Sequence, residues 1–525
     1  MHWDFPYPSQ RMPVLADCMV ATSQPLAVQA GVDCLRRGGN AVDAAITTAI
    51  TLTVVEPTSN GLGSDAFALI HFEGALYAMN GSGRSPKSWR YEQFADLPAM
   101  PQLGWPSVTI PGAVSVWMAL SQRFGCLPFA ELFSAAIGYA QSGFSVSPIT
   151  ALAWQKSAER FQEFAEFKRV YLPHGRAPET GQRFTNPDQA ATLLSIASSG
   201  GQAFYQGELA ERMLHTANQA GAAWEMDDLQ QHQAEWVVPL SINYYGYDVY
   251  ELPPNGQGLA ALIALALLQH LEIDRLAPDA VDSLHLQIEA MKAGFQAVEH
   301  YLADPEWMRV AAQDLLAASV IVQHATLIDL KKAQTLPYRL ATDHGTVYLT
   351  TADASGNMVS MIQSNYMGFG SGVVIPDTGI AMQNRGAGFS LERGHPNQVE
   401  GGKRPFHTII PGFVCKDGKP LLSFGVMGGR MQPQGHVQML LRILNGKQNP
   451  QAASDAPRWC VLEDGSVVVE AHMPPATVDA LRQRGHSISV EANRAVFGGA
   501  QIIMRHEQAY IGASDHRKDG LAAGF

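Results

Sequence analysis

The feature that most constrains this chain is an abrupt change of sequence pattern at Thr346. Residues 337–345 include proline, aspartate and glycine and have no periodic apolar pattern, which predicts an irregular segment. Residues 346–353 are rich in β-branched and aromatic types and predict a strand, and a second strand, residues 358–362, follows a turn at 354–357. A threonine that begins a strand directly behind a glycine-ended irregular segment is the arrangement that a self-cleaving chain needs.

This junction predicts a specific cleavage reaction. The hydroxyl of Thr346 would attack the carbonyl of Gly345 and cut the bond between them, and the freed α-amine would then serve as the base for the same hydroxyl. Thr342 is a competing nucleophile four residues earlier, but it falls within the irregular segment. Taken alone, a threonine at a strand start is more simply explained as an ordinary strand residue.

Motifs on both sides of Thr346 resemble those of the γ-glutamyltransferases. They include Gly-Asn-Ala-Val-Asp-Ala-Ala at 39–45, Gly-Leu-Gly at 61–63, Gly-Phe-Gly-Ser-Gly at 368–372, Lys-Arg-Pro at 403–405, Gly-Gly at 428–429 and Gly-Ala-Ser-Asp at 512–515. In that family, a threonine at this place begins the small subunit after self-cleavage. The resemblance therefore implies a large chain of residues 1–345 and a small chain of residues 346–525 that stay together as a heterodimer. It leaves open whether two such heterodimers associate.

Helical and strand patterns are mixed along the chain. Helices are predicted at residues 25–37, started by Thr22 or Ser23, at 41–55, capped by Asn40, and at 258–271, and strand pairs at 66–70 with 75–79 and at 408–415 with 420–425. Because helices and hairpins do not follow a strict βαβ order, we expect antiparallel sheets packed between helices. The resemblance makes this an α/β (α+β) fold, a four-layer αββα sandwich formed jointly by the two chains.

Composition and charge limit the partners of the protein. Of its 525 residues, 46% are hydrophobic and 16% charged, which is typical of a large buried core, and a net charge of −12 argues against nucleic acid or an anionic membrane as a partner. The five cysteines have no close spacing, as expected of reduced thiols. The start of the chain at Met1 has no secretory signal pattern, so we expect a cytoplasmic protein.

The resemblance also implies catalytic roles besides that of Thr346. Gly428 and Gly429 would donate backbone N–H groups to an oxyanion, and Ser364 stands where the family has a threonine hydroxyl bonded to the nucleophile. Without the resemblance, the glycines are explained as a turn and Ser364 as a strand residue. No HExxH motif or paired histidine spacing is present, so no metal is expected, and no cofactor is implied.

The substrate-binding positions depart from the family. Gly388 stands where γ-glutamyltransferases have an aspartate that holds the substrate's α-amino group, and Arg385 replaces a glutamine. The family's arginine for the α-carboxylate aligns with Ser82, two positions before Arg84. Two serines of the family are also replaced here, by His407 and Thr408. The residues that we assign to substrate binding are Arg385, Arg84, Asn384, His407, Thr408 and Tyr366.

Such a site lacks a carboxylate for a substrate amine but has guanidinium groups, which bind a carboxylate in a bidentate manner. We therefore expect an amide with a nearby carboxylate and no α-amino group. Among the family's relatives, the pattern resembles the oxamate amidohydrolases, which convert oxamate and water to oxalate and ammonia. Arg404 and Arg430 are equally well explained as members of structural ion pairs, and the same alternative applies to Arg84 and Arg385.

Three alternatives remain open at this stage. A γ-glutamyltransferase or glutathione hydrolase would turn over γ-glutamyl-p-nitroanilide. An acylase would cut larger, glutaryl-type amides. A non-catalytic scaffold that kept the fold would remain one chain and hydrolyse nothing.

Overall fold

The computed structural model describes residues 10–334 and 345–525. The start of the chain at Met1, most of the segment predicted to be irregular and the competing Thr342 lie outside the described residues. The described chain contains two large, fully antiparallel sheets of seven strands each, so the expected mixed α/β class is confirmed. The first sheet contains, in order, β1 (Val14–Ala16), β20 (Ala509–Ser514), β19 (Gly499–His506), β15 (Lys419–Met427), β14 (Gly412–Lys416), β9 (Tyr247–Glu251) and β8 (Leu240–Tyr244).

The second sheet holds the predicted nucleophile. Its strands, in order, are β21 (Leu521–Gly524), β2 (Met19–Thr22), β10 (Gly345–Ala352), β11 (Met358–Tyr366), β3 (Asp65–Phe72), β4 (Ala75–Asn80) and β7 (Glu235–Val237). Three small sheets are formed by β16 (Trp459–Val461), β17 (Val467–Glu470) and β18 (Ile488–Glu491), by β12 (Val374–Ile375) and β13 (Ile380–Ala381), and by β5 (Phe144–Ser145) and β6 (Arg183–Phe184).

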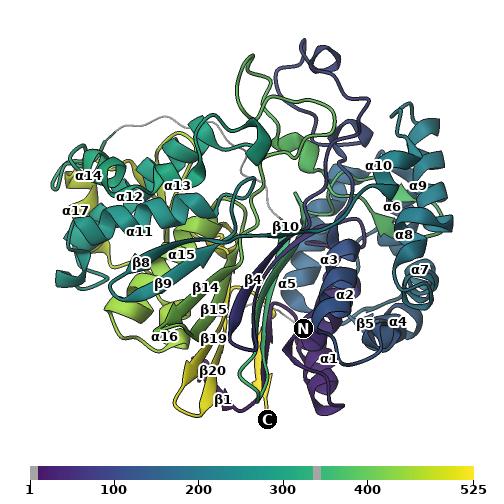
Figure 1. The fold of residues 1–525 in the computed structure, drawn as a ribbon, viewed down its shortest axis with the longest axis horizontal. Helices are drawn as coiled ribbons and strands as arrows, with labels where there is room; N and C mark the ends of the chain where they lie inside the picture. Colours follow the sequence, from purple (N-terminus) through teal and green to yellow (C-terminus); the bar gives the residue numbers. More distant parts are fainter. Residues whose placement is uncertain (1–9, 335–344) are drawn as a thin grey trace.

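Helices lie on both sides of the pair of large sheets (Figure 1). On one side are α1 (Pro25–Arg36), α2 (Ala41–Val55), α3 (Ala113–Phe124), α4 (Ser134–Ser142), α5 (Pro148–Ala158), α6 (Ala165–Tyr171), α7 (Pro187–Ser198), α8 (Gln202–Gln206), α9 (Glu208–Gln219) and α10 (Met226–Gln230). On the other side are α11 (Gly258–His270), α12 (Val281–Tyr301), α13 (Ala312–Leu315), α14 (Ala318–Ala325), α15 (Met431–Leu440), α16 (Pro450–Asp455) and α17 (Pro475–Gln483).

Strand β10 shows how the sequence pattern builds the core. Its Val347 and Leu349 belong to the apolar cluster shared with α1–α4, whereas Tyr348 belongs to a cluster that joins the two large sheets. This alternation follows from the two-residue period of a strand. Thr346 has the parity of Tyr348, so it lies on the side of β10 that faces the other large sheet.

Some predicted boundaries shift in the structure. Helix α2 begins after Asn40 as expected, and the Asn40 side chain accepts hydrogen bonds from the N–H groups of Val42 and Asp43. Helix α1 is capped by Gln24 and not by Thr22 or Ser23, because Thr22 belongs to β2. The strand expected from residue 408 begins only at Gly412. None of the helices in the described ranges has the length and apolar character that crossing a bilayer requires.

Candidate active site

A β-bulge sets the position of Thr346. Gly345 pairs with Tyr366 and Val347 pairs with Gln363, so two residues of β11, Ser364 and Asn365, lie opposite Thr346 alone. Tyr366, at the end of the bulge, has a φ of 78°, which is rare for a residue with a side chain. Such bulges re-aim side chains near functional sites. Here the bulge brings Ser364 to the side chain of Thr346.

Ser364 connects the two residues of the expected cleavage site. Its Oγ lies 3.1 Å from Oγ1 of Thr346, and its hydroxyl donates to the carbonyl oxygen of Gly345 at 2.6 Å. The same Oγ accepts from Nη2 of Arg385 at 2.9 Å and from the N–H of Tyr366 at 2.8 Å. These two donors direct the single hydroxyl hydrogen of Ser364 towards Gly345. Thr346 and Ser364 are thus in the contact that the sequence predicted.

Arg385 lies behind Ser364 and is fully buried. Besides Ser364, it donates through Nη1 to Oγ1 of Thr408 at 2.8 Å, and its Cζ lies 4.3 Å from the ring centre of Tyr366. Burial lowers the pKa of Arg385 to about 10, while Tyr366 and Asp65 act in the opposite direction. The guanidinium therefore stays charged at neutral pH and has partners within the protein.

His407 contacts a buried carboxylate that sequence reasoning missed. Its Nε2 lies 3.0 Å from Oδ2 of Asp65, whose other oxygen accepts from the N–H groups of Gly83 and Gly112. Burial raises the pKa of Asp65 to about 7, and burial also lowers the pKa of His407 well below its ordinary value, with Arg385 acting in the same direction. His407 is therefore neutral and donates to Asp65, and the carboxyl of Asp65 and the guanidinium of Arg385 influence each other's pKa. A lone aspartate after a Gly-Ser pair carries no pattern that would have identified it.

The pair Gly428-Gly429 forms the turn between β15 and α15. Their φ values are 120° and 55°, a region that favours glycine. The carbonyl of Gly429 accepts from Nε2 of Gln257 at 2.8 Å, and the same amide nitrogen donates to the carbonyl of Thr408 at 2.6 Å. Gln257, which sequence reasoning also missed, thus ties the glycine turn to the residues beside Arg385. Neither glycine N–H donates to a backbone acceptor among the described residues.

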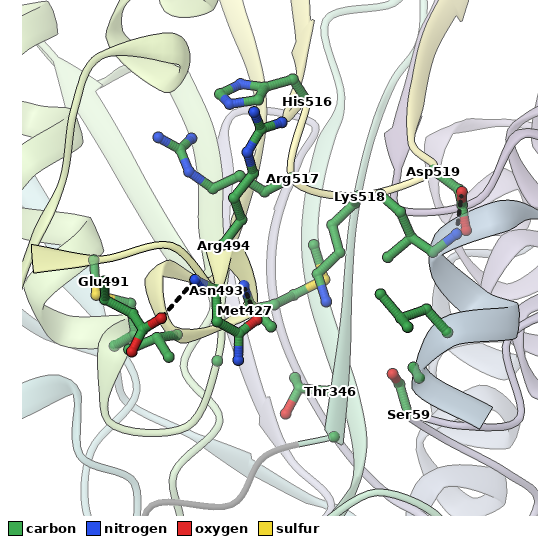
Figure 2. A pocket seen from close by; sticks show the side chains of 18 of the residues that line it. Ser59, Thr346, Met427, Glu491, Asn493, Arg494, His516, Arg517, Lys518 and Asp519 are labelled. Atoms are coloured by element: carbon green, nitrogen blue, oxygen red, sulfur yellow. Dashed lines mark hydrogen bonds between the residues drawn. The ribbon is translucent and has the colours of Figure 1, made fainter. Parts of the chain in front are cut away.

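A pocket of about 1950 Å³ opens at Thr346. Its wall includes Thr346, Gly428 and Arg430, and Figure 2 shows Thr346 on one side of the pocket with Lys518 and Arg494 on another. Thr346 itself is only 4% exposed. Within the described ranges, no group of three or more histidine, cysteine or acidic side chains is arranged to hold a metal ion.

Two of the predicted substrate ligands have other partners. Arg84 donates to Asp304 at 2.9 Å, which is the structural ion pair that the sequence left open for it. Its role as a substrate ligand stays a prediction. Asn384 supports the loop after β11, since its side chain accepts from the N–H of Met367 and donates to the carbonyl of Gln102. It positions this loop and does not contact Thr346 in the described structure.

The remaining two arginines behave differently from each other. Arg404 forms the ion pair that the sequence suggested, with Glu235 at 2.7 Å. Arg430 has no ion pair with any residue in the described part of the chain, so the structural ion pair that the sequence left open for it is not found there.

Comparison with known proteins identifies the family of this chain. The family model "Gamma-glutamyltranspeptidase" matches residues 27–525, so the chain belongs to the γ-glutamyltranspeptidase family, as the motifs indicated. It is 36% identical to the glutathione hydrolase-like YwrD proenzyme of Bacillus subtilis and 34% identical to the oxamate amidohydrolase proenzyme of Klebsiella pneumoniae, each alignment covering 97% of this chain and 98% of the relative.

A solved structure shares the whole fold. The crystal structure of cephalosporin acylase from Bacillus halodurans has a TM-score of 0.95 and 45% sequence identity, covering 100% of this chain and 99% of that chain. These relatives differ in the amides that their names specify. What they share with this chain is a family, that of N-terminal nucleophile hydrolases that cut amide bonds.

Proposed function

We propose that this protein is a self-cleaving threonine amidohydrolase whose nucleophile is Thr346. The observation that carries the proposal is the position of Ser364, which contacts both the Thr346 hydroxyl and the Gly345 carbonyl oxygen. The nucleophile and the carbonyl of one peptide bond are thus held by the same side chain. Two of the relatives are named proenzymes, which supports processing of this chain into residues 1–345 and 346–525.

In the cleavage step, Oγ1 of Thr346 attacks the Gly345 carbonyl carbon while the hydroxyl of Ser364 donates to the carbonyl oxygen. Collapse of the tetrahedral intermediate breaks the peptide C–N bond, and the Thr346 nitrogen takes up the proton released by the Thr346 hydroxyl and leaves as an amine. The chain is then joined by an ester between Gly345 and Thr346. Water hydrolyses this ester, which yields the Gly345 carboxylate and restores the Thr346 hydroxyl.

In turnover, the freed α-amine of Thr346 takes the proton of its own hydroxyl, which attacks the substrate amide. The N–H groups of Gly428 and Gly429 donate to the oxyanion, and each such donor typically lowers the barrier by about 3–4 kcal/mol. The leaving amine or ammonia takes the proton from the Thr346 amine. Water then releases the acid from the Thr346 ester.

We propose that the substrate is the amide of an acid that carries a carboxylate, with oxamate as the first candidate. The relative named oxamate amidohydrolase supports this choice. Gly388 supports it too, because a Cβ there would lie 2.6 Å from the carbonyl oxygen of Phe406. No aspartate side chain fits at this position, so the family's partner for a γ-glutamyl α-amine is missing.

The pocket favours a second candidate, the monoamides of longer dicarboxylic acids. Its volume of about 1950 Å³ exceeds the roughly 300–1,000 Å³ typical of pockets for drug-sized ligands, and oxamate would fill little of it. The cephalosporin acylase with the same fold also supports a larger substrate.

The experiment that tests the proposed function is ammonia release by the processed protein from oxamate, succinamate and glutaramate. We expect turnover of at least one of them, and none by Thr346→Ala. Turnover of γ-glutamyl-p-nitroanilide without ammonia release from any of the three would contradict the proposed substrate class and favour the γ-glutamyl reaction.

A further inference from the structure

Arg430 is an unusual buried cation in the wall of the pocket that contains Thr346. It directly follows Gly428-Gly429 and precedes α15, and its side chain is only 5% exposed. Its position in the chain therefore ties it to the proposed oxyanion site. The mechanism described above does not use it.

The guanidinium of Arg430 has no hydrogen-bond partner in the described structure. This holds for Nε, Nη1 and Nη2, although all three atoms are buried. The neighbour that faces it is the ring of Phe295, whose centre lies 4.9 Å from Cζ. A cation–π contact contributes about 0.5–2 kcal/mol, whereas an unpaired buried charge costs considerably more. An anion that accepts hydrogen bonds from this guanidinium would offset the cost of the unpaired charge.

Other buried arginines of this protein have their partners. Arg458 contacts Asp515 at 2.5 Å, Arg517 contacts Glu470 at 2.5 Å, and Arg385 donates to two hydroxyl groups. Arg430 donates to no described residue, so it has more N–H groups available for an anion than Arg385, to which the sequence assigned this role.

Tyr366 lies close enough to Arg430 to act on its pKa. The Tyr366 ring stacks on Arg385, and Tyr366 is the bulge residue that pairs with Gly345. Burial lowers the pKa of Arg430 to about 10, while Glu463, Glu299 and Tyr366 act in the opposite direction. Arg430 is thus charged at neutral pH, and the residue that acts on its pKa, Tyr366, pairs with Gly345 at the cleavage site.

We propose that Arg430 binds the carboxylate of the substrate in a bidentate manner and so selects monoamides of dicarboxylic acids over neutral amides. This inference rests on the proposed function, in which Thr346 attacks the amide end of the same molecule. Arg430 and Thr346 both line this pocket, so we infer that one ligand reaches both residues.

The test uses matched pairs of substrates that differ only in charge. Oxamate, succinamate and glutaramate are each compared with the diamide of the same acid, which replaces the carboxylate by a neutral amide, and ammonia release is measured. For Arg430→Gln, we expect kcat/KM for the monoamide to fall about 10- to 100-fold, and kcat/KM for the diamide to change less than about 2-fold. Arg430→Lys keeps the charge but not the bidentate geometry, and should fall in between.

Several variants separate this role from its rivals. Arg212→Gln removes an exposed, ion-paired arginine on α9 and should leave both rates unchanged. Arg494→Gln and Lys518→Gln remove two other cations of the pocket wall. If either of them, or Arg385→Gln, caused the selective loss in place of Arg430→Gln, the assignment would be overturned. An equal loss for monoamide and diamide would show a purely structural role and would overturn it as well.

Binding measurements keep this inference apart from the proposed function. Calorimetric titration of oxalate, succinate and glutarate into the processed protein should show binding that Arg430→Gln loses. If the wild type bound these anions through Arg430 but hydrolysed no amide, the proposed function would fail and this inference would stand. If the Gly345 carboxylate left by cleavage occupied Arg430, no added dicarboxylate would bind, which would overturn the inference.

Discussion

At the scale of single residues, Ser364 carries the most consequence. One hydroxyl group contacts the nucleophile, polarises the Gly345 carbonyl and accepts two N–H donors. The donors from Arg385 and Tyr366 leave it one orientation for its hydrogen. Arg385 and Tyr366 therefore fix the orientation in which the Ser364 hydroxyl donates to the Gly345 carbonyl.

Replacement of Ser364 by alanine should slow self-cleavage. Loss of one donor to a reacting carbonyl typically costs about 10²-fold in rate, so uncut precursor should accumulate for Ser364→Ala. The time course of cleavage, followed by denaturing electrophoresis, measures this. Ser364→Thr keeps the hydroxyl and should cleave at close to the wild-type rate. Equal rates for the alanine variant and the wild type would remove Ser364 from the mechanism.

Asp65 should make stability depend on pH. Its pKa is raised from the ordinary 3.8 to about 7 by burial, so the folded state holds the proton more tightly than the unfolded state and stability falls as pH rises from about 4 to about 7. Asp65→Asn removes this slope but alters the bond to His407 at every pH. The stability of Asp65→Asn relative to the wild type should therefore increase between pH 5 and pH 8, by on the order of 2–4 kcal/mol.

Chemical denaturation of both proteins at the two pH values measures this difference. A difference that stays constant between pH 5 and pH 8 would show that Asp65 is ionised throughout, in a permanent pair with Arg385.

The sequence predicted part of this site at the level of residues. Thr346, Ser364, Arg385 and Thr408 lie in one connected set of contacts. Their positions could be proposed from the sequence because the motifs of the family mark them. The residues that were missed act through tertiary contacts. Asp65 is 342 positions from His407, its partner, and Gln257 joins two loops that come together only in the folded chain.

At the scale of elements, the junction at the start of β10 depends on the absence of a side chain. A Cβ on Gly345 would lie 2.6 Å from the nitrogen and 2.7 Å from the oxygen of Gly368. A side chain at this position would push the start of the strand away from the loop that follows β11.

Gly345→Ala should therefore slow self-cleavage. Displacement of a reacting group by about 1 Å can cost on the order of 10²-fold in rate, and the displaced carbonyl would also leave the Ser364 hydroxyl. The intact mass of freshly purified protein, taken over time, measures the uncut fraction. Gly138→Ala in α4 is the control, because its Cβ would meet nothing within 4 Å. Normal cleavage of Gly345→Ala would show that the junction tolerates this shift.

Local sequence predicted most elements near the site for clear physical reasons. The Asn40 cap and the apolar residues that follow it specify α2, and the change from irregular to β-branched residues specifies β10. The bulge opposite Thr346 was not predicted, because it depends on the register between β10 and β11 and not on the composition of either strand.

At the scale of the whole molecule, the segments before and after the cleavage site share both large sheets. In the second sheet, β10, β11 and β21 of the later segment are interleaved with β2, β3, β4 and β7 of the earlier one. In the first sheet, β1, β9 and β8 flank four strands of the later segment. Separation of the segments would break strand pairs in both sheets and expose the cluster between them.

The two chains should accordingly stay together after cleavage. Size-exclusion chromatography of cut protein should give both chains in one peak under native conditions, and two peaks only in denaturant. Separation without denaturant would show that the shared sheets do not hold the cleaved protein together.

The most direct test of the central claim is the intact mass of the denatured protein, measured for the wild type and for Thr346→Ala. We predict two fragments for the wild type, one that ends at Gly345 and one that begins at Thr346, and a single uncut chain of 56.8 kDa for the variant. A single uncut chain in both samples would contradict the account, because Thr346 would then have no free amine to act as its base.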